Sequence, residues 1–92
     1  MISLLLASAI VASEPNLQDD TFYGVTSEEV TCIVVLNYFQ NKTKAFEVGK
    51  VLDKKMTSNN LLALFDETGF VSISDFAMKM TLDEARAIVY AS

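Results

Sequence analysis

The chain has 92 residues, 51% of them hydrophobic, and a formal net charge of -5. This length and apolar content are typical of one ordered domain with a modest core. With no histidine, one cysteine and three widely separated glycines, the chain has no Ser-His or Cys-His catalytic pair, no Cys/His zinc cluster, no intramolecular disulfide and no Gly-rich phosphate loop. We therefore expect a protein that is not an enzyme and that holds neither a metal nor a cofactor.

The N-terminal stretch 1–13, MISLLLASAIVAS, joins an apolar run to small residues, as a signal peptide does, but it lacks the preceding basic residue. As a helix, residues 2–12 would be about 16 Å long, which is too short to cross a membrane. Apolar side chains would surround that helix, so we expect it to pack on its own domain and on a second subunit. This predicts a cytoplasmic homodimer joined through an N-terminal helix, with no membrane association.

The next helix is expected to begin near Thr26. Pro15 ends the N-terminal helix, and residues 16–24 form a polar connector whose Leu17, Phe22 and Tyr23 return to the core. Residues 26–29, TSEE, match a capping box and start a helix that runs through residue 40. The single cysteine, Cys32, lies in its apolar run and is expected to be a buried small hydrophobe.

Two short helices joined by a polar turn are predicted over residues 43–69. The first places Gly49 on its apolar face, where a small residue would let the two consecutive helices cross closely. Thr57 or Ser58 is suited to cap the second helix, and Gly69 is suited to end it in the left-handed conformation. The apolar residues assigned to these two helix faces are Ala45, Val48, Gly49 and Leu52, and then Leu61, Leu62 and Phe65.

The hydrophobic period changes after residue 69. Residues 70–80 alternate between apolar and polar or small side chains around a Ser74-Asp75 turn, which predicts a small β-hairpin. Residues 81–84, TLDE, form a second capping-box pattern and start a closing helix with Arg86 exposed. The fold class expected from the whole chain is mainly α with a small β-hairpin.

This order of elements, and three stretches of sequence, resemble the winged helix-turn-helix superfamily, which includes small MarR- and PadR-like repressors. Residues 46–52 resemble its second helix, residues 67–71 resemble the end of its recognition helix, and residues 80–86, MTLDEAR, resemble the segment after the wing. The resemblance implies two regions: an extra N-terminal apolar helix with its connector over 1–25, and a winged-helix domain over 26–92.

The resemblance implies a small dimeric transcriptional regulator that binds double-stranded DNA. The start of the recognition helix would enter the major groove, where Asn pairs with adenine, while lysines hold phosphates. Residues 42–55 support this with five lysines against two acids, a local charge of +3. The expected DNA-binding residues are Lys44, Lys54, Lys55, Thr57, Ser58, Asn59, Asn60 and Lys79.

Two features keep a protein partner open as an alternative. The presumed recognition helix contains no Arg or Lys, and Asp75 stands where a wing is usually basic, so the chain could be an acidic interaction module or inhibitor. Residues 64–76 also resemble an EF-hand loop with its flanking helices, but the loop from Asp66 to Asp75 is about two residues shorter than the 12 that calcium requires. A calcium-free, light-chain-like lobe that binds a partner helix is the corresponding form of this alternative.

Overall fold

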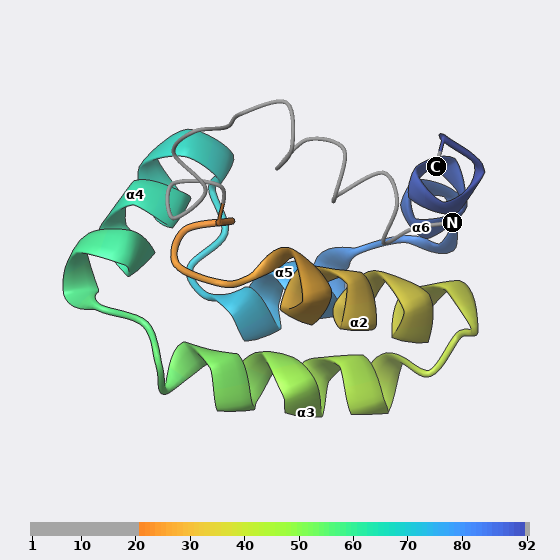
Figure 1. Cartoon of the computed structure of the whole chain (residues 1–92), viewed down its shortest axis with the longest axis horizontal. Helices are drawn as coiled ribbons and strands as arrows, with labels where there is room; N and C mark the ends of the chain where they lie inside the picture. The colour runs from red at the N-terminus through yellow and green to blue at the C-terminus, as the bar shows by residue number, and fades with distance from the viewer. Residues whose placement is uncertain (1–20, 92) are drawn as a thin grey trace.

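Helices form the regular secondary structure of residues 21–91, the part of the chain that this computed structural model describes (Figure 1). The predicted N-terminal helix over 2–12 lies outside the described residues, as does Leu17. Within residues 21–91, no helix is long and apolar enough to cross a membrane. The helices in chain order are α2 Ser27–Tyr38, α3 Lys42–Asp53, α4 Ser58–Thr68, α5 Ile73–Lys79 and α6 Leu82–Ala91.

Helix α2 is the centre of the packing, because it contacts α3, α5 and α6. The most extensive helix–helix contact is between α3 and α5, while α4 and α6 lie at opposite ends of the molecule (Figure 1). Ile33 of α2, Leu64 of α4 and Ile73 of α5 are fully buried in one shared core. The predicted return of Phe22 and Tyr23 is confirmed, since both pack against that core.

The local signals for the helix ends are confirmed. Thr26 and Glu29 form the predicted capping box at the start of α2. Thr57 caps α4 by accepting a hydrogen bond from the backbone N–H of Asn60 at 3.1 Å, and Gly69 ends α4 with φ +85°. The second predicted capping box is also present, where the Thr81 and Glu84 side chains each accept from the other residue's backbone N–H. Such caps satisfy helix-end N–H groups from nearby residues alone, so the sequence shows them directly.

The β-hairpin predicted over residues 70–80 is wrong, and the winged fold is therefore wrong with it, although the mainly α character is correct. Residues 73–79 form helix α5, and no strand is present in the described part of the chain. Ser72 caps this helix by accepting from the backbone N–H of Asp75 at 3.0 Å. Ile73, Ala77 and Met80, at i, i+4 and i+7, are all buried, so the apolar residues follow a helical period as well as an alternating one. The cap decides between the two periods.

The predicted crossing of two consecutive helices at Gly49 is also wrong. Gly49 lies against α5, where an added methyl group would stand 2.6 Å from Cα and 2.9 Å from the backbone N of Ser74. The glycine thus permits close packing of α3 on α5, two elements onward, while α4 is displaced to one end of the molecule (Figure 1). The sequence indicates that a small residue is needed there, but not which helix approaches it.

The expectation that Cys32 is buried is wrong as well. Its neighbours Ile33 and Val34 are buried, but Cys32 itself is an exposed free thiol on α2. The apolar run of α2 is longer than the face that the core covers, so some of its members are left at the surface.

Candidate functional site

Helix α4 carries apolar side chains on two sides. Leu64 points into the core and is fully buried, whereas Leu62 is 61% exposed and Phe65 is 51% exposed. A shallow hollow of 460 Å³ lies over this second side. We call the residues that line the hollow the α4 face: Ser58, Leu61, Leu62, Phe65 and Val71.

The α4 face is built by helical spacing and by the turn that follows the helix. Its first four members stand at i, i+3, i+4 and i+7 and therefore share one side of α4. The left-handed residue Gly69 reverses the chain, which brings Val71, 61% exposed, to the same hollow. Large apolar side chains that are grouped at a surface commonly mark a binding site. The α4 face is the candidate that the geometry offers.

The opposite edge of α4 is attached to the turn that precedes α2. The Tyr23 hydroxyl donates a hydrogen bond to the Glu67 carboxylate at 2.5 Å, and this bond raises the pKa of Tyr23 because the hydroxyl can donate it only while it keeps its proton. Gly24 has φ +93°, and an added Cβ there would collide with Nδ2 of Asn60. These contacts fix which side of α4 faces outward.

The lysines predicted to hold phosphates are mostly engaged within the protein. Lys44 pairs with Glu47 on the same helix at 3.9 Å, and Lys79 pairs with Asp75 at 3.3 Å. Lys55 pairs with Glu29 and lowers the pKa of that carboxyl group. Lys79 is the last residue of α5, whereas the prediction placed it on the wing of a β-hairpin.

One further lysine of the basic cluster is directed inward. The Lys42 ammonium group donates hydrogen bonds to the backbone carbonyl oxygens of Ala77 and Met80 at the end of α5. Burial lowers the pKa of Lys42, and the charge of Glu84 partly opposes that shift. Three of the five lysines in residues 42–55 are thus engaged in hydrogen bonds or ion pairs within the protein: Lys42, Lys44 and Lys55.

The predicted base-reading residues are divided between two sides of α4. Thr57 uses its hydroxyl oxygen as the helix cap, and Ser58 lines the α4 face. Asn59 is exposed, as is Lys54 in the preceding turn, but Asn60 is half-buried against the Gly24 turn. Of the predicted DNA-binding residues, Lys54, Ser58 and Asn59 are exposed together near the start of α4. Asn60 lies on another side of the helix.

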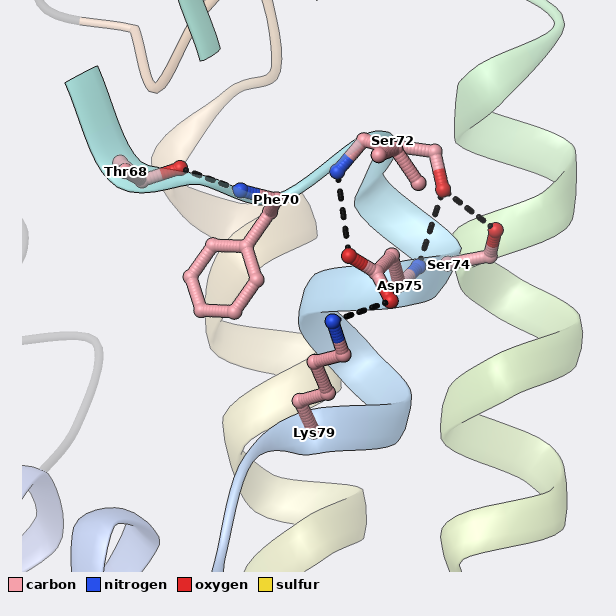
Figure 2. Close-up of polar contacts among 7 residues, drawn as sticks. Thr68, Phe70, Ser72, Ser74, Asp75 and Lys79 are labelled. Carbon is pink, nitrogen blue, oxygen red and sulfur yellow. Dashed lines mark hydrogen bonds and ion pairs between the residues drawn. The ribbon is translucent and has the colours of Figure 1, made fainter. Parts of the chain in front are cut away.

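A polar cluster lies at the start of α5 (Figure 2). Asp75 is buried, and its carboxylate accepts from the backbone N–H of Val71 at 3.0 Å and pairs with Lys79. The hydroxyl groups of Ser72 and Ser74 lie 2.9 Å apart. Each of these polar groups has a partner within the fold, with Ser72 capping α5 and the Ser74 hydroxyl donating to Asp53 of α3, so the cluster offers no unused acid or nucleophile.

The short loop between α4 and α5 bears on the EF-hand resemblance. Asp66 is exposed on α4, whereas Asp75 is committed to the cap of α5. Among residues 21–91, no three His, Cys, Asp or Glu side chains are grouped so that they could hold a metal ion.

The sequence contains a signal for the α4 face, although the prediction from helical spacing only places Leu61, Leu62 and Phe65 on one side of the helix and does not indicate that this side is exposed. Leu61, Leu62, Leu64 and Phe65 span too wide an arc of one short helix to be buried on a single side. Of these four, only Leu64 is fully buried.

The whole chain was compared with family models, with curated proteins and with solved structures. None of the three comparisons finds a match.

Proposed function

We propose that the protein is a protein-binding module whose α4 face receives an amphipathic helix of a partner. The observation that carries this proposal is the exposure of Leu62, Phe65 and Val71 around one hollow. A helix that lays an apolar side into such a hollow is a common mode of peptide recognition. The apolar side of the partner would cover the exposed groups and release water from them.

Charge defines the partner further. Helix α4 carries the exposed Asp66 and no basic residue, and the chain as a whole has a net charge of -5. A partner helix with Lys or Arg beside its apolar stripe would therefore be attracted, and an acidic one repelled. The proposed ligand class is a basic amphipathic helix.

The test uses designed peptides as defined probes. One peptide carries Leu at i, i+3, i+4 and i+7 with Lys elsewhere, a second replaces Lys by Glu, and a third scrambles the first. Fluorescence anisotropy should show binding of the first peptide only. Phe65→Glu should weaken that binding at least about tenfold, equivalent to about 1.4 kcal/mol.

The matched control is Phe39→Glu. Phe39 is also an exposed aromatic residue, at 71%, but it lies at the end of α2 and does not line the α4 face. This variant should bind the basic peptide as the unmodified protein does. Equal loss in both variants, or equal binding of the Lys peptide and its scrambled form, would count against the α4 face as a specific site.

DNA binding is the second candidate, favoured by the exposure of Ser58, Asn59 and Lys54 near the start of α4. Helix starts of this kind can contact phosphates through their N–H groups. A mobility shift with mixed-sequence duplex DNA should appear at low salt, weaken at high salt and disappear in Lys54→Glu. Lys54 is the better position to change, because replacing Lys55 would also remove its pair with Glu29. Absence of a shift at low salt would reject this candidate.

A further inference from the structure

A second apolar hollow, separate from the α4 face, lies between α5 and α6. We call it the α5–α6 groove; it has a volume of 320 Å³, and six residues line it: Phe70, Phe76, Met80, Glu84, Ala87 and Ile88. Glu84 is its one charged residue, and the carboxylate of Glu84 is already bonded to the backbone N–H of Thr81 at 2.8 Å. The groove therefore suits an uncharged, apolar occupant.

The described chain begins beside this groove. The ring of Phe22 lies 5.1 Å from the ring of Phe76, and Phe76 in turn lies 5.5 Å from Phe70. Phe70 and Phe76 both line the α5–α6 groove. The residues that precede Thr21 in the sequence therefore join the described part of the molecule next to the groove.

We infer that the α5–α6 groove is the docking site for residues 2–12 of the same chain. This segment, ISLLLASAIVA, has no charged side chain, which matches the nearly uncharged groove. Residues 13–20 connect the segment to Thr21, and eight extended residues reach up to about 28 Å. That reach is ample for a groove whose wall touches Phe22.

The short connection favours the segment of the same chain over that of a second copy. A connection of only eight residues holds the segment near the groove at an effective concentration of the order of millimolar, far above the micromolar concentrations of a typical protein solution. Intramolecular docking therefore fills the groove before another molecule can. The groove and the α4 face are lined by different residues, so this docking leaves the proposed partner site open.

Tryptophan fluorescence in the full-length chain tests this inference, because the chain contains no tryptophan of its own. Leu5→Trp places a single reporter in the segment. Its emission should lie at a shorter wavelength than that of a solvent-exposed tryptophan, and Ala87→Arg, which places a charge in the groove, should shift the emission toward the solvent value. The matched control Val51→Arg changes an exposed apolar residue of α3 outside the groove and should leave the emission unchanged.

Cross-linking gives a second readout that does not depend on the Ala87→Arg variant. In a Cys32→Ser background, cysteines are introduced singly at positions 4, 6 and 10 and combined with Ala87→Cys, and a short bis-maleimide is added. At least one pair should link within a monomer, as seen by mass spectrometry. Links that join two molecules would overturn docking within one chain in favour of a second copy. Absence of any link, or an emission that Ala87→Arg does not change in a variant with retained helical circular dichroism, would overturn the groove as the site.

Discussion

At the scale of single residues, two residues of α3, Gly49 and Asp53, fix the position of α5. Gly49 lets the backbones approach, and Asp53, one turn onward, accepts hydrogen bonds from the backbone N–H of Ile73 at 2.6 Å and from the hydroxyl of Ser74 at 2.6 Å. Hydrogen bonds to a charged acceptor are among the stronger polar contacts in proteins. Together, the small residue and the carboxylate explain why α3 packs more closely on α5 than on its sequence neighbour α4.

Gly49→Ala should therefore destabilise the protein, although alanine favours a helix by about 1 kcal/mol over glycine. The added methyl group would collide with the Ser74 backbone, which cannot move aside as the end of a flexible side chain can, so the cost should lie at the upper end of the roughly 1–3 kcal/mol typical of overpacking, at about 2–3 kcal/mol. We expect a net loss of about 1–2 kcal/mol in the free energy of unfolding, measured by urea denaturation. Val51→Ala, at an exposed site of the same helix, should change it by less than about 0.5 kcal/mol. A Gly49→Ala protein as stable as the original would show that the α3–α5 contact can yield.

The residues whose roles the sequence reveals are those whose partners are near in the chain. Thr26, Thr57, Thr81 and Gly69 each act within a few residues of themselves, so their roles could be predicted. The partner of Asp53 lies 20 residues away, and no local pattern identifies it. The same limit applies to the inward-directed Lys42, whose acceptors are carbonyl groups more than 30 residues onward.

At the scale of elements, α4 differs from the other helices in how it is held. It takes part in none of the main helix–helix contacts of the described chain, and its attachment rests on Leu64 in the core and on the turn that carries Tyr23 and Gly24. Helices with few packing partners open more readily than those in a core. The α4 face therefore lies on the element best able to adjust to a partner.

Hydrogen exchange should reveal this difference. Backbone amides in the middle of α4, around Leu64, should exchange at least about tenfold faster than those of α3 around Ala45, since opening free energies differ between weakly and strongly packed units. Tyr23→Phe, which removes the hydrogen bond to Glu67, should increase exchange in α4 and leave α3 unchanged. Equal protection of both helices would contradict a separately opening α4.

The error over residues 70–80 also belongs to this scale. Val71, Ile73, Met78 and Met80 alternate with small or polar residues, and in seven or so residues an alternating pattern and a helical one cannot be separated by apolar positions alone. The deciding information is Ser72 followed three residues later by Asp75, which is a cap pattern and not a hairpin turn. Giving the capping pattern at Ser72 more weight than the alternation of apolar residues would have predicted helix α5.

At the scale of the whole molecule, charge also contributes to stability. The Glu29 carboxylate at the start of α2 is bonded to Lys55, in the turn between α3 and α4, and this bond is the main reason that its pKa is lowered; a hydrogen bond from the Thr26 backbone adds to the effect. A carboxyl group whose pKa is lower in the folded state stabilises the fold above its unfolded pKa of about 4.3. That contribution is lost as the pH falls through the folded pKa.

Glu29→Gln should thus make the midpoint of urea unfolding less sensitive to pH between about pH 5 and pH 3. Lys55→Met should remove part of the same acid-dependent component, and the double variant should add little to Glu29→Gln, because the two residues act on each other. If the pH dependence of Glu29→Gln matches that of the unmodified protein, the contact between α2 and the α3–α4 turn is too exposed to matter.

The arrangement of α3 and α5 has one more consequence, for engineering. Because Asp53 touches the first residue of α5, residues 54–72 leave the body and return to it at one place, much as an antibody loop does on its framework. Provided that Leu64 is kept as the anchor, the outward positions of α4 could be randomised as a library without altering the α2–α3–α5 scaffold. The molecule would then serve as a display frame of 92 residues, with a single helix as its variable part.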